Sequence, residues 1–444
     1  MQLGGCKSDG GILHVALSPG VASPTSYCVT LSAGGARRFG RRYETAAYPL
    51  PQSLGVRADG QSTMVVRLDG LLDGLRTLTS AQTVALPGDA TISIVTCAPK
   101  VAPEPLSLRS ADSFPFAAQR IAFVRTGLEL PGASSLVAVS NASGVIASYP
   151  YGRDGKLAIA PAPGGGSTVE ALASLDIDGD CADDLLVAAD GAPVAAWSTS
   201  SSGAISVDGA RLADPEAAHA LAVGDLDGDG WADLVKIGVD GGSVLLSDRK
   251  QGFVRATGFS VQPTNSTAAA IGDLDQDGIS DLLVGFSDGP LLWTRGDGTG
   301  GFTGLTALPG TSQTAAVALF DLDHDGALDV IAGTTAGLAV YRNDGQGSFT
   351  DVSATLVPPG LDTNIVALRV VDTDGDCALD LLVAGATTAP HLLALGASGL
   401  VDRGAIGTDP VRDLDAADLD GDGLPEVVGV GFTRIEIYST TASP

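Results

Sequence analysis

Short segments with alternating or continuous apolar residues recur through most of the chain in one fixed order. Each repeat begins with an alternating segment such as AHALAVG (218–224) and continues with a mostly apolar segment such as DLLVGF (281–286). A third segment such as LAVYRND (338–344) follows, and in several repeats a glycine-rich turn leads into a fourth. Four short strands with turn residues between them, and no helical periodicity, are typical of a β-propeller blade.

An acidic loop separates the first and second segments in six of the repeats. It follows the pattern Asp-x-Asp-x-Asp-(Gly/Cys)-x-x-(Asp/Glu)-(Leu/Val). The copies begin at Asp176, Asp225, Asp273, Asp321, Asp372 and Asp418, so successive starts are 49, 48, 48, 51 and 46 residues apart. A nearly constant period of this length indicates a repeat architecture in which each copy is one structural unit.

Each loop places four carboxylates at relative positions 1, 3, 5 and 9, and such an oxygen-rich cage suits a hard cation such as Ca²⁺. Position 6 is Gly in four copies, where a sharp turn favours a positive φ, and position 7 is expected to offer its backbone carbonyl. The ions are interpreted as staples of the fold, with direct bridging to a ligand as the alternative. The predicted metal ligands are Asp176, Asp178, Asp180, Ala182, Asp184, Asp225, Asp227, Asp229, Trp231, Asp233, Asp273, Asp275, Asp277, Ile279, Asp281, Asp321, Asp323, Asp325, Ala327, Asp329, Asp372, Asp374, Asp376, Ala378, Asp380, Asp418, Asp420, Asp422, Leu424 and Glu426.

The same positions exclude three other calcium-binding motifs. An EF-hand needs a carboxylate at position 12 between two helices, and a dockerin-type loop also needs an acid there. The flanking segments are strand-like, and the glycine-rich nonapeptide of RTX proteins does not occur in the sequence. The residues found at position 12 are Val187, Lys236, Val284, Ala332, Val383 and Gly429.

A seventh, altered copy of the loop lies upstream of the six acidic ones. GLELPGASSL (127–136) starts 49 residues before Asp176, but Gly127, Glu129, Pro131 and Ser135 occupy the ligand positions. The sequence therefore predicts seven blades, six of them with metal loops.

The last repeat contains only three strands, so its fourth strand is expected from elsewhere in the chain. Residues 104–112 precede the first blade, and we expect them to pair with the third strand of the last one. A ring closed in this way leaves no exposed strand edge at the seam.

Residues 1–100 do not follow the repeat. Their alternating segments, separated by Gly, Pro and Ser turns, predict a small antiparallel β-sandwich with a flexible N-terminus. The Pro-rich segment APKVAPEP (98–105) marks the boundary with the propeller, which is placed at 101–444. The predicted fold class is thus all-β: a seven-bladed β-propeller with calcium-binding loops, preceded by a small β-sandwich domain.

The acidic loops, their period of about 48 residues and their strand–loop–strand context resemble the FG-GAP/VCBS repeats of integrin-α-like seven-bladed propellers. The segment YRNDGQGSFTDVSA (341–354) also looks like the blade ending of bacterial VCBS repeats. The resemblance extends from about residue 104 to 444 and does not cover the N-terminal domain. It implies up to six Ca²⁺ ions, bound on one face of the ring by the loops between first and second strands.

The net charge of −27 is concentrated in the loops, whose ligand positions hold 24 of the 52 acidic residues (six loops of four). Six divalent ions would add 12 charges and bring the net charge to about −15. Nucleic acid is not an expected partner, because phosphate binding needs Lys/Arg patches. No apolar run approaches the roughly 20 residues of a membrane helix, so no transmembrane segment is predicted.

The N-terminus lacks the apolar stretch of a signal peptide. Leu3-Gly4-Gly5-Cys6 resembles the end of a bacterial lipoprotein signal, which would make Cys6 a lipidated residue; a plain flexible start is the alternative. Only 5 of the 25 basic residues are Lys, a bias associated with GC-rich bacterial genomes. We expect a secreted or cell-surface bacterial protein, with a lipid anchor at Cys6 as one option.

The five cysteines, Cys6, Cys28, Cys97, Cys181 and Cys377, fit no zinc or redox motif. Cys28 and Cys97 lie in strand-like segments and would form a disulfide in an exported protein, with two buried free thiols as the alternative. Cys181 and Cys377 replace the position-6 Gly in two separate repeats, so a bond between them across the ring is not expected.

Several further motifs are interpreted as structural. The RGD tripeptide (295–297) occupies the same turn as RND (342–344), so hairpin chemistry explains it better than adhesion. Trp231 is the candidate for an exposed aromatic residue. Four aromatic residues at like places in third strands are expected to pack inside the blades: Trp197, Trp293, Tyr341 and Tyr438.

None of the four His lies in a recognisable nucleophile motif, and no catalytic residue is predicted. The sequence predicts a non-enzymatic, calcium-binding extracellular recognition or adhesion protein whose partner is a surface protein or a glycan, and it leaves the oligomeric state open. A lectin-like carbohydrate-binding propeller is one alternative. An extracellular polysaccharide-active enzyme is the other, since an Asp-rich chain offers many paired acids.

Overall fold

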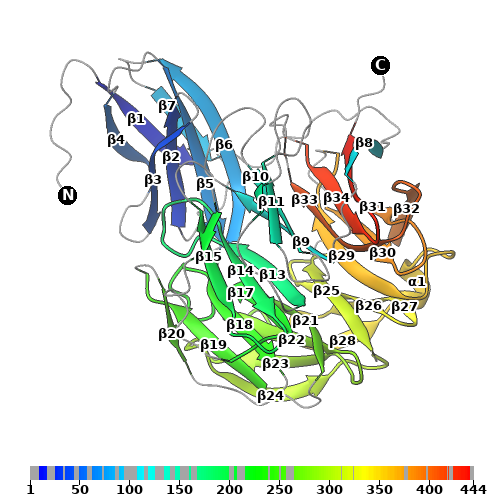
Figure 1. The fold of residues 1–444 in the computed structure, drawn as a ribbon. Coiled ribbons are helices and arrows are strands. Elements are labelled where there is room, and N and C mark those ends of the chain that lie inside the picture. Colours follow the sequence, from blue (N-terminus) through cyan, green and yellow to red (C-terminus); the bar gives the residue numbers. More distant parts are fainter. Residues whose placement is uncertain are drawn as a thin grey trace.

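The computed structural model describes strands along nearly the whole chain (Figure 1). The expected flexible N-terminus, the boundary segment 98–105 and the altered turn at 127–134 lie outside the described residues. The described residues are 10–17, 26–33, 36–44, 50–57, 63–72, 75–85, 90–94, 108–114, 119–125, 135–140, 146–150, 160–161, 168–199, 205–207, 216–238, 241–249, 252–256, 265–311, 313–323, 325–374, 379–396, 399–417, 419 and 424–440.

The first seven strands form two sheets. The three-stranded sheet has the order β4-β1-β7, with β1 (Gly10–Leu17), β4 (Gln52–Arg57) and β7 (Ala90–Ile94). The four-stranded sheet has the order β3-β2-β5-β6, with β2 (Ser26–Ala33), β3 (Ala36–Glu44), β5 (Thr63–Leu72) and β6 (Leu75–Ala85).

The expectation of purely antiparallel strands in this region is wrong for one pair, because β1 and β7 run parallel. A parallel pair needs a long crossover connection, and the strands between β1 and β7 provide it. Burial follows the period of two that the sequence predicts for strands with one covered face. The residues that show it include Val15, Val29, Leu31, Val66 and Leu68.

Six further antiparallel sheets each contain four consecutive strands. Their strands are β9 (Arg120–Arg125), β10 (Ser135–Ser140), β11 (Ile146–Pro150) and β12 (Ala160–Pro161); β13 (Val169–Leu175), β14 (Asp184–Ala189), β15 (Ala195–Thr199) and β16 (Ile205–Val207); β17 (Ala220–Gly224), β18 (Asp233–Gly238), β19 (Gly241–Ser247) and β20 (Phe253–Arg255); β21 (Ser266–Gly272), β22 (Asp281–Phe286), β23 (Leu292–Gly296) and β24 (Phe302–Ala307); β25 (Thr314–Phe320), β26 (Asp329–Thr334), β27 (Gly337–Asn343) and β28 (Phe349–Asp351); β29 (Ile365–Val371), β30 (Asp380–Gly385), β31 (His391–Gly396) and β32 (Gly399–Ala405).

One more four-stranded sheet is composite. It consists of β33 (Val411–Ala417), β34 (Glu426–Gly431), β35 (Ile435–Thr440) and, as its outer strand, β8 (Leu108–Phe114). β8 pairs antiparallel with β35, so a segment from before the first blade completes the last sheet. This is the pairing that the sequence predicts, with the strand at 108–114 instead of 104–112. Because β8 covers the edge of β35, that edge is not available for pairing with another chain.

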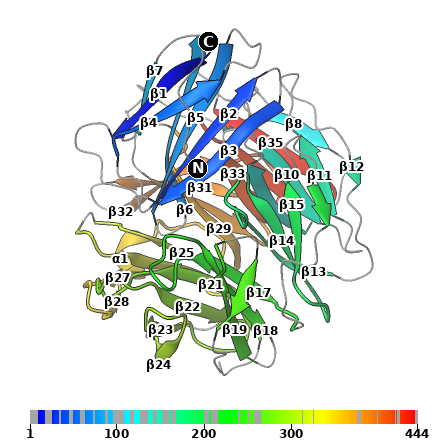
Figure 2. The same ribbon diagram turned by 90° about the vertical axis from the view of Figure 1, so that its left-hand side faces the viewer.

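The first strands of these sheets surround a common axis (Figure 2). In chain order β9, β13, β17, β21, β25, β29 and β33 each contact the next, and β33 contacts β9, which closes the cycle. The sheets therefore radiate from the axis as the blades of a β-propeller, and the predicted all-β propeller is confirmed.

The second strand of each blade lies in the densest part of the fold. β22, β26, β30 and β34 are buried at every residue. A sheet covered on both faces by its neighbours needs strands that are apolar on both sides, which explains the near-continuous apolar runs after each acidic loop. The only described helix is α1 (Ser353–Leu356), a single turn that the sequence does not predict. No helix among the described residues is long and apolar enough to cross a membrane.

The third-strand aromatics pack inside the ring, as the sequence predicts. Trp197, Trp293, Tyr341 and Tyr438 are each at most 9% exposed. Trp293 packs against a hairpin of the following blade, where a Cβ added to Gly347 would lie 2.2 Å from the indole ring. Gly347 also has a φ of +76°, which favours glycine. Glycine is therefore required here by both backbone conformation and space.

We expect Gly347→Ala to destabilise the propeller because it adds a steric overlap in a packed core, at a cost of about 1–3 kcal/mol. Gly304→Ala is the matched control, since Gly304 has a similar φ of +71° but open space around its Cβ position. Thermal melts should show a clearly lower melting temperature for the first variant than for the second. Equal melting temperatures would contradict the packing role of Trp293.

Candidate metal centre

The acidic loops connect the first and second strands of their blades. The loop at Asp225 lies between β17 and β18, and the loops at Asp176, Asp273 and Asp321 occupy the same place in their blades. The loops at 372 and 418 are described only in part. The predicted ligands Asp376, Ala378, Asp418, Asp420 and Asp422 lie outside the described residues.

The position-1 carboxylate organises the turn of each described loop. In the second loop, Asp225 Oδ1 accepts the backbone N–H of Asp229 at 3.1 Å and Oδ2 accepts that of Gly230 at 2.7 Å. Asp229 in turn accepts the N–H of Trp231 at 2.7 Å. The same pattern recurs in the loops at Asp176, Asp273 and Asp321. The loops are thus shaped by their own carboxylates.

Three acidic side chains in each of four loops converge, with oxygens that all lie within 4.8 Å of one another. Calcium binds oxygens at about 2.3–2.6 Å, so two ligands on opposite sides of one ion lie about 5 Å apart. The spacing and the all-oxygen donor set therefore fit Ca²⁺. The four groups are Asp176, Asp178 and Asp180; Asp225, Asp227 and Asp229; Asp273, Asp275 and Asp281; and Asp321, Asp323 and Asp325.

The position-9 carboxylate has a second role that the sequence reasoning missed. Asp233 is fully buried, and its Oδ2 accepts the N–H of Leu226 at 2.8 Å while its Oδ1 accepts the N–H of Ser247 at 2.8 Å. It therefore ties the metal loop to the end of the third strand. Asp281 and Asp329 make the same two bonds in their blades. In the other three loops the position-9 carboxylate accepts a backbone N–H group of its own loop. The pairs are Asp184 with Ile177, Asp380 with Thr373, and Glu426 with Leu419.

Burial and mutual repulsion raise the pKa values of these acids. The pKa of Asp233 is raised to about 7, mainly by burial and further by the charges of Asp227 and Asp229, against the lowering effect of its N–H partners. A bound divalent cation would favour the ionised forms. Burial also raises the pKa values of Asp225, Asp227, Asp275, Asp281 and Asp329.

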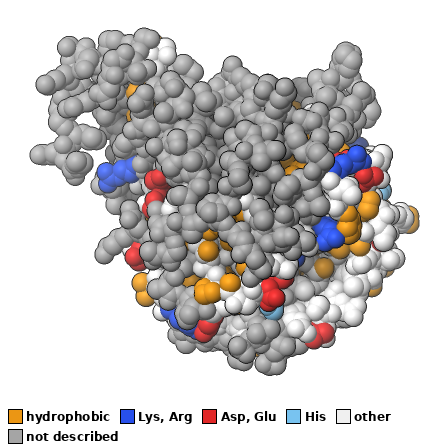
Figure 3. All heavy atoms as spheres, in the orientation of Figure 1, with side chains coloured by type: hydrophobic (Ala, Val, Ile, Leu, Met, Phe, Trp, Pro, Cys, Tyr) orange, Lys and Arg blue, Asp and Glu red, His pale blue; other side chains and the backbone are white. Residues whose placement is uncertain are grey.

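In three loops an arginine near the end of the third strand pairs with a loop carboxylate. The pairs are Arg249 with Asp229, Arg295 with Asp275, and Arg342 with Asp323 at 2.7 Å. Acidic and basic side chains also lie beside one another in the surface view of Figure 3. One half-exposed guanidinium offsets at most one of the four negative charges of a loop, so most of the charge is left for a metal ion.

Arg295 belongs to the RGD tripeptide, whose structural interpretation agrees with these contacts. Asp297 accepts the N–H groups of Thr299 and Gly301, and Asp344 makes the corresponding bonds in the RND turn. Both tripeptides therefore form the same type of hairpin turn.

Position 6 has the positive φ that the sequence predicts. The values are +84° at Gly230, +85° at Gly278, +91° at Gly326 and +69° at Cys181. Cys181 is fully buried and disulfide-bonded. The expected Cys28–Cys97 bond stays a prediction, since Cys97 lies outside the described residues.

The expectation that Trp231 is an exposed aromatic is wrong, because its side chain is only 8% exposed. Its ring packs against Gly179 of the preceding loop, where a Cβ would lie 2.4 Å from the indole. Arg42 of β3 covers the ring with its Cζ 4.3 Å from the centroid and donates its backbone N–H to the Gly179 carbonyl at 3.1 Å. The N-terminal region thus contacts the first two metal loops, a contact between residues too distant in sequence to predict.

A family model for FG-GAP-like repeats matches residues 176–236, 273–332 and 325–383. No curated protein matches the chain. Among solved structures, the crystal structure of the computationally designed Ika8 protein matches 75% of this chain and 99% of its own, with 17% identity and a TM-score of 0.46.

The first two matched segments begin at Asp176 and Asp273, the first ligand positions of two loops, and the third begins within the loop at Asp321. Together with the ring of four-stranded sheets, these matches show a β-propeller that contains FG-GAP-like repeats.

Proposed function

We propose that this propeller is a calcium-binding extracellular recognition or adhesion protein, in which Ca²⁺ staples the loops at one end of a seven-bladed ring. The convergence of three acidic side chains within 4.8 Å in each of four loops carries the proposal. FG-GAP repeats are typical of extracellular proteins, and the chain contains three matches to them. Recognition of a surface protein or glycan, not catalysis, is the role proposed for the ring.

Calcium would be held by positions 1, 3, 5 and 9 and by the position-7 carbonyl of each acidic loop, up to six ions in all. A carboxylate oxygen has more than one lone pair, so Asp233 can accept its two backbone N–H groups and still face the ion. Binding would then join the acidic turn to a buried anchor between the second and third strands.

Export from the cytoplasm is proposed on two grounds. Cys181 is disulfide-bonded, and disulfides persist in oxidising compartments. Extracellular calcium modules work at roughly 10⁻⁴–10⁻³ M, a concentration at which the acidic loops would be filled outside the cell. A lipid anchor at Cys6 belongs to the same proposal.

The N-terminal strands are proposed to form a β-sandwich domain from the sheets β4-β1-β7 and β3-β2-β5-β6. Contacts of β7 with β5 and β6 and the alternating burial of β1, β2 and β5 support this arrangement. Because Arg42 reaches Gly179 and Trp231, the domain would cover two of the metal loops.

A lectin-like function is the second candidate, and a specific observation favours it. A cavity of about 590 Å³ lies on the axis of the ring, lined by the first strands. Its volume falls in the usual range of small-molecule sites.

Calcium should raise the melting temperature of chelated protein substantially, since a site filled at 100 times its dissociation constant adds about 2.7 kcal/mol. Thermal melts in EDTA and in millimolar Ca²⁺ measure the shift. Asp227→Ala removes a predicted ligand and should reduce it. Asp190→Ala, which removes the same charge from an exposed position outside the loops, should leave it intact. A melting temperature that is the same in EDTA and in Ca²⁺ would contradict the calcium proposal.

The stabilisation by calcium should grow between pH 6 and pH 8. The folded pKa of Asp233, about 7, lies above its ordinary 3.8, so its contribution to the metal-free fold is complete below about pH 4 and is lost as pH rises through 7. Calcium needs the ionised carboxylate, so its affinity rises over the same range. Melts with and without Ca²⁺ at both pH values test this, and a gap that stays constant would contradict it.

Recognition itself is tested with the full chain immobilised in Ca²⁺ and in EDTA, probed with a glycan array and with cell-surface extracts. We expect at least one specific ligand to be retained in Ca²⁺ and to be bound more weakly in EDTA, where the loop carboxylates repel one another. Failure to retain any ligand in Ca²⁺ would count against a recognition role.

A further inference from the structure

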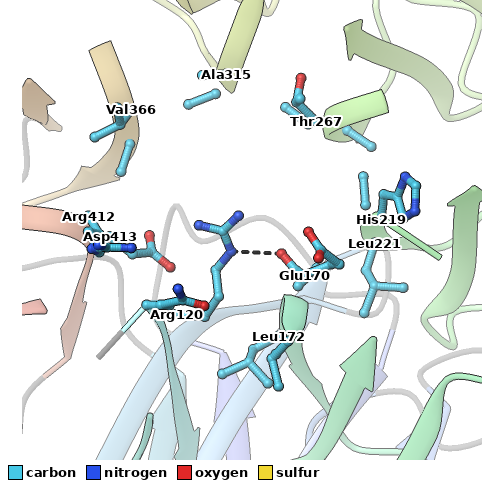
Figure 4. Close-up of a pocket in the computed structure, with 18 of the residues that line it drawn as sticks. Arg120, Glu170, Leu172, His219, Leu221, Thr267, Ala315, Val366, Arg412 and Asp413 are labelled. Carbon is cyan, nitrogen blue, oxygen red and sulfur yellow. Dashed lines mark hydrogen bonds between the residues drawn. The ribbon is translucent and has the colours of Figure 1, made fainter. Parts of the chain in front are cut away.

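The axial cavity lies at the opposite end of the first strands from the metal loops. Its lining includes residues at or near the starts of these strands, such as Val169 of β13, whereas the loop at Asp176 follows the end of the same strand. The cavity is therefore separate from the proposed calcium sites. Figure 4 shows side chains from several blades facing one open space.

Small side chains create this space. The first strands converge at the axis, and alanine occupies many of the positions that face it, so a volume of about 590 Å³ stays open. Because the walls are strands of a closed ring, the cavity is formed in advance of any ligand. The lining alanines are Ala171, Ala220, Ala268, Ala269, Ala315, Ala316, Ala367 and Ala386.

Arg120 is the central polar group of the cavity. Its Nε donates to the backbone carbonyl of Glu170 at 2.7 Å. Its two terminal nitrogens make no hydrogen bond or ion pair with any described residue, and Figure 4 shows them directed into the open space. A guanidinium with a free pair of donors is suited to bidentate binding of a carboxylate.

The other charges of the axis leave this arginine available. Asp413 accepts the N–H groups of Ile121 at 3.2 Å and Leu414 at 3.0 Å and lies 3.6 Å from Arg369. Asp415 accepts the Nε–H of Arg369 at 3.3 Å. Arg369 thus pairs with both acids of β33, and neither acid forms an ion pair with Arg120 in the described part of the chain.

A second arginine lies at the rim. Arg412 stacks on Phe432, with its Cζ 3.9 Å from the ring centroid, and its buried Nε has no hydrogen-bond partner among the described residues. Phe432 is 55% exposed. The lining carries Arg120, Arg369 and Arg412 against Glu170 and Asp413, a formal charge of +1 (three minus two) in a chain of −27. The cavity lining is therefore less acidic than the protein as a whole, which favours entry of a small anion.

We propose that the axial cavity binds the carboxylate-bearing end of an acidic saccharide, with a single uronic acid residue as the unit recognised. The carboxylate pairs with Arg120, hydroxyl groups donate to the Glu170 carboxylate, and His219 and Thr267 line the opposite wall. The exposed ring of Phe432 covers an apolar face of the sugar at the rim. Long polyanions are repelled by the surrounding negative charge, so a terminal residue enters.

This inference rests on the proposed recognition function but not on calcium. Its test uses the full chain in Ca²⁺, with galacturonate and glucuronate as probes and galactose and glucose as matched neutral sugars, measured by calorimetry and saturation-transfer NMR. The uronates should bind at least about tenfold more tightly than the neutral sugars, as expected for a charge-assisted bond.

Arg120→Gln should weaken uronate binding by at least about tenfold. Ala315→Leu, which fills the cavity without altering its charge, should abolish it. Arg403→Gln removes the same charge from an exposed outer strand and should leave binding unchanged. Melting temperatures of the variants confirm that each is folded.

Three results would overturn the inference: no uronate binding, equal binding of neutral sugars, or preferential binding of a zwitterion such as free alanine through Arg120. If a surface ligand is retained by the chain while uronates do not bind, recognition stands and the cavity assignment fails. If uronates bind but the melting temperature does not change with calcium, the metal proposal fails and the cavity assignment stands.

Discussion

The fold depends on one buried carboxylate in each metal-loop blade. Asp233 begins the second strand of its blade and bonds the N–H of Leu226 in the acidic loop and the N–H of Ser247 at the end of the third strand. Three consecutive parts of the blade are thereby held by a single side chain. Its removal would leave two N–H groups without partners in the interior, where unmade hydrogen bonds cost about 1–3 kcal/mol each.

The same carboxylate creates an electrostatic conflict, because it is buried beside Asp227 and Asp229 and its pKa is raised to about 7. The partly exposed Arg249 pairs with Asp229 and relieves only part of this repulsion. A bound divalent cation would reduce the repulsion between these carboxylates, because it attracts all of them at once. The proposed metal binding would therefore be coupled to blade stability within each loop.

Much of the fold could be predicted because its signals are local. The loop period and the alternation within strands depend only on residues close together in the sequence. The same holds for the positive φ at position 6, which is found at Gly230 and Cys181. Features that depend on distant residues could not be predicted. Trp231 is buried because Arg42 covers it. The sequence does not show that Arg369 pairs with Asp415, because that contact depends on β29 and β33 lying side by side at the axis.

The two ends of the ring are joined by the first strands, so one scaffold would hold both of the proposed sites. Outside the blade of β9, each of these strands starts near the axial cavity and ends at an acidic loop, as β13 does between Val169 and Asp176. Side chains at the strand starts can therefore change the ligand without altering the loop. An influence of calcium on ligand affinity would be expected along these strands, because they connect the two proposed sites directly. Because coupling between two binding sites is reciprocal, the ligand would then change calcium affinity by the same factor.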